Sequence, residues 1–307
     1  MTAVAVEPRL TELADADLES LLLIRHFEQR LLELFSAGLL HGTTHTCLGQ
    51  EYVAVAISGL LTDADHVFSN HRGHGHYLAR FADPEGLLAE IMGREGGVCH
   101  GVGGSQHLYR EGYLSTGVQG ESLPLAAGVA MKLKRTGHGG LSCVYIGDGT
   151  WGEGAVYEAL NLIALHALPV LVVVEHNGIA QSTPTARQMA GTIAGRAAAF
   201  GVAHRRIDSV DVAAIRTELA PLVEQVRTGH RPLVVEFATH RIGPHSKGDD
   251  TRTDEEIARV RAADWLPRYR RDHPEQTARL EPAVWARMDA VAGEVSARPQ
   301  STWERSA

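Results

Sequence analysis

Two short segments in the middle of the chain carry oxygen-bearing groups that suit a divalent metal and a diphosphate. The sequence GDGTWGEG occupies residues 147–154, and EHNG follows at 175–178. Asp148 offers a carboxylate, Asn177 an amide oxygen and Ile179 a backbone carbonyl. Hard oxygens of this kind are the ligands that Mg²⁺ takes, usually together with phosphate oxygens and water. The segments therefore favour a magnesium site on Asp148, Asn177 and the adjacent Ile179, beside a bound diphosphate, with ordinary turns at the ends of two strands as the alternative.

A second kind of metal site is suggested by the run HRGHGH, in which His71, His74 and His76 are possible zinc ligands. The same run holds no cysteine or carboxylate. Incidental clustering is therefore the favoured interpretation, and zinc the alternative.

The elements around the first two segments predict how they are positioned. Residues 141–146 and 170–174 are short apolar runs, and the amphipathic stretch 154–166 lies between them. Apolar strands joined by a helix are typical of a parallel sheet that is covered on both faces. Ligands bind outside the carboxyl ends of such strands. We therefore expect Asp148 and Asn177 to meet at one edge of a sheet.

The rest of the chain is predicted to add helices and one more strand. Apolar spacing predicts helices over 17–37 (ending near Gly38), 50–61, 84–92 and 211–228, a strand over 232–239, and helical structure over 254–298. Residues 96–120 are too rich in glycine for a regular element throughout, so they are expected to form a loop that approaches another group closely. We predict one α/β domain over 1–307 with a mostly parallel sheet and helices on both faces. Its core would span about 20–255, followed by a C-terminal helical extension over about 256–300.

The composition is that of an ordinary globular protein. Hydrophobic residues make up 44% of the chain and charged residues 21%, and the net charge of −8 argues against a nucleic-acid-binding role. No apolar run approaches the ~20 residues that span a bilayer. The three cysteines are far apart, and the N-terminal residues lack the pattern of a signal peptide. A cytoplasmic location is therefore expected.

Taken together, the motifs resemble the alpha subunit of the thiamine diphosphate-dependent decarboxylating component of 2-oxo acid dehydrogenase complexes, of the pyruvate, branched-chain or acetoin type. GDG followed by an amphipathic helix, an apolar strand and Asn-Gly is similar to the cofactor motif of that family. Further blocks follow in the family's order: IRHFEQR (24–30), THTCLGQE (44–51), HRGHG (71–75), GREGG (93–97), GGSQHL (103–108), GVQGESLPLAAG (117–128) and RIGPHSKGDD (241–250). The resemblance covers about 20–255 and implies the thiamine diphosphate-binding fold.

Carried over residue by residue, the resemblance implies a site for thiamine diphosphate and Mg²⁺. The implied metal ligands are Asp148, Asn177 and the Ile179 carbonyl. The implied cofactor contacts are His71, Arg72, Gly117, Gln119, Gly147, Asp148, Gly149, Thr150, Asn177 and His245. His45 and His245 match the catalytic histidines that the family keeps near the thiazolium and the substrate, where a neutral imidazole can shuttle protons.

The chain departs from the family pattern at five positions. The family usually has tyrosine at the positions of His71 and Ile179, asparagine at His176, methionine at Gln106, and at Gln119 an apolar residue that props the cofactor. These departures bear on the identity of the substrate and the acyl acceptor more than on cofactor binding.

Three hypotheses about the reaction follow. The enzyme either reductively acylates a lipoyl carrier, or transfers an activated acetaldehyde unit to a carbonyl acceptor such as a sugar, which makes an acyloin. The third hypothesis, a degenerate scaffold subunit, is disfavoured because Asp148, Asn177, Arg72 and His245 are all present. The resemblance also implies a separate beta subunit, since 307 residues leave no room for the domain that grips the aminopyrimidine and supplies its activating glutamate. The expected assembly is a heterotetramer of two alpha and two beta chains that acts on a pyruvate-like 2-oxo acid.

Overall fold

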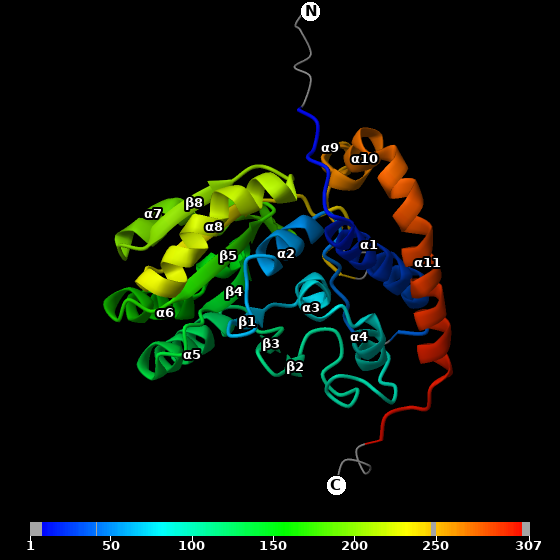
Figure 1. Cartoon of the computed structure of the whole chain (residues 1–307), viewed down its shortest axis with the longest axis horizontal. Helices are drawn as coiled ribbons and strands as arrows, with labels where there is room; N and C mark the ends of the chain where they lie inside the picture. The colour runs from blue at the N-terminus through cyan, green and yellow to red at the C-terminus, as the bar shows by residue number, and fades with distance from the viewer. Residues whose placement is uncertain (1–7, 41, 247–249, 303–307) are drawn as a thin grey trace, which may run out of the picture.

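The computed structural model describes residues 8–40, 42–246 and 250–302, and its centre is a seven-stranded sheet (Figure 1). The strands lie in the order β2 (Tyr109–Arg110), β3 (Tyr113–Ser115), β1 (His66–Ser69), β4 (Ser142–Gly147), β5 (Val170–His176), β9 (Leu233–Ala238) and β8 (Ala203–Ile207). Neighbouring strands are parallel except for the β2–β3 pair at one edge. The predicted α/β class with a mostly parallel sheet is confirmed.

Alternate residues of the central strands face two separate hydrophobic cores. On β4, Val144 and Ile146 belong to one core, whereas Cys143 and Tyr145 belong to the other. The first core is covered by α5 (Ser122–Thr136), α6 (Gly154–Leu165) and α7 (Ile193–Ala199). The second is covered by α1 (Asp15–Ser36), α2 (Glu51–Ser58), α3 (His74–Phe81), α4 (Pro84–Ile91) and α8 (Val212–Gly229), so the sheet has helices on both faces (Figure 1).

The C-terminal part consists of α9 (Asp254–Ala262), α10 (Trp265–Asp272) and α11 (Pro274–Ala297), which confirms its helical character. The long α11 runs beside α1 and α4 (Figure 1), and its buried side chains belong to the same core as theirs. A buried ion-pair network holds this region to α1, because Arg25 binds Glu51 at 2.5 Å and Asp264 at 2.8 Å. The division into a core and an extension stays a prediction.

The predicted helices and strands are present, and their bounds agree with the prediction to within three residues. The elements that periodicity did not indicate include β1, β2, β3, β8, α3, α5 and α7. β1 has only four residues, and the edge strand β8 is mostly solvent-exposed, so neither forms a long apolar run. The glycine-rich segment 96–120 is irregular apart from the short strands β2 and β3. Within the described residues, no helix combines the length and the apolar character needed to cross a membrane.

Candidate functional site

A cavity of about 440 Å³ lies at the carboxyl ends of β1, β3, β4, β5 and β9. Parallel strands end at a common edge, and the loops that leave them surround one crevice. Every site residue predicted from the sequence lines this cavity: His45, His71, Arg72, Gly117, Gln119, Gly147, Asp148, Gly149, Thr150, Asn177, Ile179 and His245. The last of the quoted motifs, 241–250, is described only in part, since residues 247–249 lie outside the described residues.

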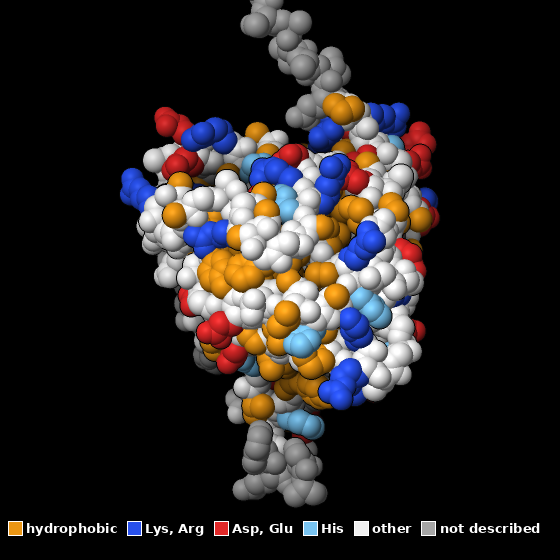
Figure 2. All heavy atoms as spheres, turned by 90° about the vertical axis from the view of Figure 1, so that its left-hand side faces the viewer, with side chains coloured by type: hydrophobic (Ala, Val, Ile, Leu, Met, Phe, Trp, Pro, Cys, Tyr) orange, Lys and Arg blue, Asp and Glu red, His pale blue; other side chains and the backbone are white. Residues whose placement is uncertain are grey.

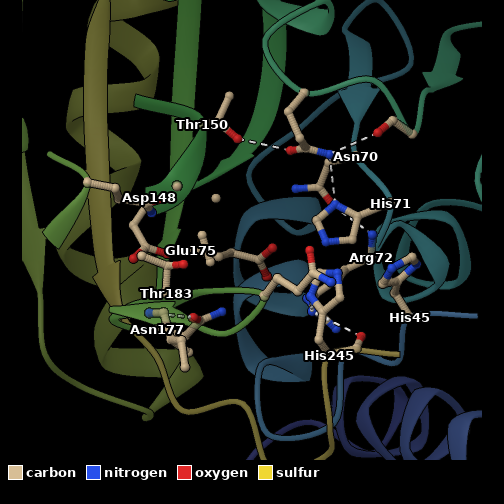
Figure 3. Close-up of a pocket in the computed structure, with 18 of the residues that line it drawn as sticks. His45, Asn70, His71, Arg72, Asp148, Thr150, Glu175, Asn177, Thr183 and His245 are labelled. Atoms are coloured by element: carbon tan, nitrogen blue, oxygen red, sulfur yellow. Dashed lines mark hydrogen bonds between the residues drawn. The ribbon is translucent and has the colours of Figure 1, made fainter. Parts of the chain in front are cut away.

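One end of the cavity, the oxygen end, is formed by Asp148 and Asn177 (Figure 3). Ile179, whose N–H bonds to Asn177, completes it. Asp148 directly follows β4 and is only 2% exposed, and its Oδ2 accepts a hydrogen bond from the Thr185 hydroxyl. Asn177 follows β5, and its Oδ1 accepts the Ile179 N–H at 3.2 Å. A carbonyl oxygen has two lone pairs, so this bond leaves one for a metal.

The chemistry of the oxygen end fits a magnesium diphosphate. The atoms that could ligate a metal are a carboxylate oxygen, an amide oxygen and a backbone carbonyl oxygen, all of them hard ligands. Gln50 accepts from Asn177 Nδ2 at 3.2 Å, and its own buried Nε2 has no hydrogen-bond partner in the part of the chain that the structure describes. A polar bound group would satisfy that donor.

Gly149 shows how closely the backbone is packed beside this end. A Cβ at this position would lie 2.5 Å from Ala180 Cβ and 3.2 Å from Gln188 Nε2. Ala180 belongs to the hairpin of β6 (Ile179–Ala180) and β7 (Thr183–Pro184). Only glycine allows the turn after β4 to pass so close to this hairpin.

The other end, the histidine end, is formed by His45, His71 and His245 together with Arg72 (Figure 3). The ring centroid of His45 lies 4.7 Å from that of His71 and 4.7 Å from that of His245. The His71 and His245 centroids are 5.6 Å apart. One nitrogen of each ring lies within 4.8 Å of one nitrogen of each of the others.

Arg72 is the main charged group at the histidine end. The guanidinium is buried, donates to the Thr46 carbonyl at 2.8 Å and lies 3.0 Å from His245 Nδ1. Burial and the neighbouring Arg241 guanidinium lower the pKa of Arg72 to about 10, so Arg72 is still charged at neutral pH. Two close guanidinium groups make this end attractive to a phosphate anion.

His71 forms a polar chain with two other predicted site residues. Its Nδ1 lies 2.9 Å from Gln119 Nε2, and Gln119 Oε1 accepts the Thr150 hydroxyl at 2.9 Å. Burial and the Arg72 guanidinium lower the pKa of His71 well below its ordinary value. The ring is therefore neutral at pH 7.

His74 and His76 do not join His71, although the three share one sequence run. His74 Nε2 lies 2.7 Å from the Ser105 hydroxyl, and its Nδ1 lies 3.2 Å from Glu28. The Nδ1 of His76 lies 2.7 Å from the Ser69 hydroxyl. Both rings are buried away from the cavity lining, which argues against the zinc alternative.

Three groups at or behind the site escaped the sequence interpretation, namely Glu175, Thr185 and Glu236. Glu175, which is 3% exposed, lines the cavity, and its place beside His176 and Asn177 was the available signal. Thr185 reaches Asp148 from beyond the hairpin, and no spacing indicated it. Behind the oxygen end, His176 Nε2 lies 3.7 Å from Asp148 Oδ2, and its Nδ1 is 2.8 Å from Glu236, which lies on β9.

Comparison with known proteins agrees with the resemblance seen in the motifs. The family model described as "Dehydrogenase E1 component" matches residues 19–293. Pyruvate dehydrogenase E1 component subunit alpha from Zymomonas mobilis is 39% identical over 76% of this chain and 67% of its own length, and the same subunit from Rhizobium meliloti is 36% identical over 88% and 78%. The alpha subunit of acetoin:2,6-dichlorophenolindophenol oxidoreductase from Bacillus subtilis is 38% identical over 75% of this chain and 71% of its own length.

Proposed function

This chain belongs to the dehydrogenase E1 component family, and we propose that it works as the alpha subunit of an enzyme that decarboxylates a pyruvate-like 2-oxo acid with thiamine diphosphate and Mg²⁺. The acyl fragment then passes to an acceptor. One observation carries the proposal: every residue that the family motifs assign to the cofactor lines a single cavity at the carboxyl edge of the sheet. The cytoplasmic location stays a prediction.

We assign the metal to the oxygen end and the diphosphate to the space beside it. Asp148, Asn177 and the Ile179 carbonyl would hold Mg²⁺. Gly147, Gly149, Thr150, Arg72 and His245 would contact the diphosphate, and Gly117, Gln119 and His71 the rest of the cofactor. When bound, thiamine diphosphate supplies a nucleophilic carbon and an electron sink for decarboxylation.

The chain's own residues would prepare this pocket in two ways. The buried charge of Arg72 offsets the negative charge of the diphosphate, and the low-dielectric surroundings strengthen that attraction. His45 and His245 stand at the same end and would exchange protons with the substrate. The histidine end would thus receive the reacting part of the substrate.

The proposal is tested by assaying carbon dioxide release from pyruvate by the chain assembled with its beta partner. Turnover that requires both added thiamine diphosphate and Mg²⁺ is expected. An assembled pair that binds neither the cofactor nor a 2-oxo acid would contradict the proposal.

The beta subunit would dock on the segment 96–120 and the start of α5. Several large apolar side chains are exposed along it: Val102 (63%), Tyr109 (66%), Val118 (55%) and Leu125 (45%). Figure 2 shows that apolar side chains also gather on the face that carries α5 and α6. Burial of such surface favours association. Light scattering should find two alpha and two beta chains in the complex, and the alpha chain alone should be inactive.

A second candidate reaction is transfer of the acyl unit to a carbonyl acceptor instead of a lipoyl carrier. The hydrogen bonds that link Thr150, Gln119 and His71 favour this second reaction. They place polar groups where the family usually has an apolar residue. Mass spectrometry of the products decides between them. Formation of an acyloin with a keto-sugar supports this candidate. In Gln119→Val, the rate of acyloin formation should then fall more than the rate of decarboxylation. An acyl-lipoyl product without acyloin excludes it.

A further inference from the structure

We propose that Gln119 fixes the proton of His71 on Nε2, so that His71 acts in the pocket as a neutral hydrogen-bond donor to an oxygen of the small-molecule substrate. His71 would then be a specificity-determining group and not a general base. The protonation state follows from this chain's own contacts, whereas the role toward substrate rests on the proposed function.

The first step is the orientation of the Gln119 amide. One of its terminal atoms lies 3.2 Å from the Gly117 carbonyl and 2.9 Å from His71 Nδ1, and the other lies 2.9 Å from the Thr150 hydroxyl. A backbone carbonyl can only accept, so the atom facing Gly117 must be the NH₂ group. The amide oxygen then accepts from Thr150, and both N–H donors of the amide are used.

The second step is the tautomer of His71. The amide nitrogen of Gln119 only donates, so His71 Nδ1 must accept. An imidazole whose Nδ1 accepts carries its proton on Nε2 when neutral. Protonation of Nδ1 would set two N–H groups against each other 2.9 Å apart, which is unfavourable. The hydrogen bond therefore excludes the imidazolium as well as the other tautomer.

The surrounding charges act in the same direction. The Arg72 and Arg241 guanidinium groups and the rings of His45 and His245 all face His71, and each of them disfavours a positive charge on it. Burial adds to this effect and keeps the pKa of His71 below its ordinary value. A neutral ring still carries one N–H donor, so His71 keeps this donor at neutral pH.

The same logic applies to His245 and bears on metal binding. The Arg72 guanidinium, which can only donate, lies 3.0 Å from His245 Nδ1, so this ring also carries its proton on Nε2. A metal on Nε2 would need the proton moved to Nδ1, against Gln119 in one ring and Arg72 in the other. The cluster of His45, His71 and His245 is thereby poorly suited to zinc, although its nitrogens lie close enough together.

A neutral donor suits a carbonyl or carboxylate oxygen of a substrate. It stabilises negative charge that develops on oxygen, and it loses no proton when the pH rises through neutrality. The tyrosine usual in the family at this position also carries one donor, but on a hydroxyl that can accept as well. Histidine locked by Gln119 can only donate toward the pocket.

The protonation state can be measured without any activity. Two-bond ¹H–¹⁵N correlation spectra of the ¹⁵N-labelled full chain distinguish the two tautomers and the imidazolium, and the signals of His71 are those lost in His71→Phe. We expect an unprotonated Nδ1 between about pH 8 and about pH 6, a range that crosses the ordinary histidine pKa. In Gln119→Glu the new carboxylate accepts from Nδ1–H, so the proton should move to Nδ1 and proton affinity should rise about tenfold or more. Gln188→Leu, which changes a glutamine near Gly149 at the other end, should leave the His71 signals unchanged.

A protonated Nδ1 in the unmodified chain, or a Gln119→Glu spectrum identical to it, would overturn the assignment of the proton. The donor role is tested separately, with the enzyme assembled on its beta partner. His71→Phe should lower kcat/KM about fivefold to tenfold, the usual effect of one lost hydrogen bond, and His71→Tyr should recover most of the loss. If kcat/KM for decarboxylation falls in His71→Phe, the hydrogen bond from His71 goes to the 2-oxo acid. If only the transfer step slows, the bond goes to the acceptor.

Equal activity of His71→Phe and the unmodified enzyme would disprove the donor role. An assembled enzyme without any 2-oxo acid turnover would instead contradict the proposed function, and the nuclear magnetic resonance result would still stand.

Discussion

The two ends of the cavity are built on different principles. The oxygen end takes Asp148 and Asn177 from the ends of two adjacent strands, β4 and β5, and their backbones are held by the sheet. The histidine end takes His45, His71 and His245 from three loops that are far apart in the chain. The oxygen end offers a carboxylate and neutral oxygens, whereas the histidine end holds the buried guanidinium of Arg72 and the neutral imidazole of His71.

Under the proposed function, this difference would separate two tasks. A metal requires ligands at fixed positions, and adjacent strands of a parallel sheet place them with little freedom. A substrate pocket requires adaptable contacts, which loops provide. We therefore expect changes at the oxygen end to abolish cofactor binding, and changes at the histidine end to alter affinity, substrate preference or proton transfer by smaller factors.

The largest effect is expected from Asp148→Ala. Loss of a supporting contact around a metal site costs roughly 10–100-fold in metal affinity, so loss of the charged ligand itself should cost more than about 100-fold. Calorimetric titration of the assembled pair with thiamine diphosphate and Mg²⁺ measures the change. Asp63→Ala, an exposed aspartate, is the matched control. Unchanged affinity in Asp148→Ala would remove the metal from the oxygen end.

Arg72→Lys tests the histidine end with the charge conserved. Lysine lacks the planar fork that reaches the Thr46 carbonyl, His245 and a phosphate together. We expect cofactor affinity to fall roughly tenfold to 100-fold, the range for lost hydrogen bonds to charged groups. The same titration measures it, with the exposed Arg259→Lys as control. A loss equal to that of Asp148→Ala would contradict the ranking of the two ends.

Asn177→Ala should have a smaller effect, because it removes a neutral oxygen from the metal. We expect cofactor affinity to fall about tenfold, with an increased requirement for Mg²⁺. Titration at several Mg²⁺ concentrations measures both quantities. If Asn177→Ala weakened binding more than Asp148→Ala, the carboxylate would not be the principal ligand.

The smallest effect concerns the support behind the oxygen end. Burial raises the pKa of Glu236, but hydrogen bonds from His176 and His204 outweigh burial and lower the pKa to about 2 from an ordinary 4.5. The bond to Glu236 in turn raises the pKa of His176 above its ordinary 6.5. The Glu236 contribution to stability is complete above pH 4.5 and is lost as the pH falls through about 2. The His176 contribution is complete below pH 6.5 and is lost as the pH rises through its folded-state pKa.

Glu236→Gln should therefore lower the melting temperature most between pH 4.5 and 6.5, by about 2–4 °C per kcal/mol lost. Thermal melts across a pH series measure the difference, with the exposed Glu255→Gln as control. A difference independent of pH would show that the charges of this pair do not contribute to folding.

The agreement between sequence and structure is closest where local pattern and topology act together. The apolar runs before Asp148 and Asn177, with one helix between them, predicted a parallel pair, and parallel strands end at the same edge. The other predicted site residues that line the cavity were indicated by the resemblance of the motifs to a known family. Elements without long apolar runs, such as β1 and β8, escaped because periodicity is the only signal that a single sequence provides for them.

What the sequence by itself determined is thus the type of sheet, the oxygen end and the membership of each site residue in a family motif. Only the tertiary structure decided which of these side chains touch. Gln119 bonds to His71 and Thr150, while His74 and His76 turn to Ser105 and Ser69. The spacing of apolar side chains along a strand or helix follows from backbone geometry and can be counted in the sequence. Contacts between loops depend on how helices and strands far apart in the chain pack, and local spacing does not encode that packing.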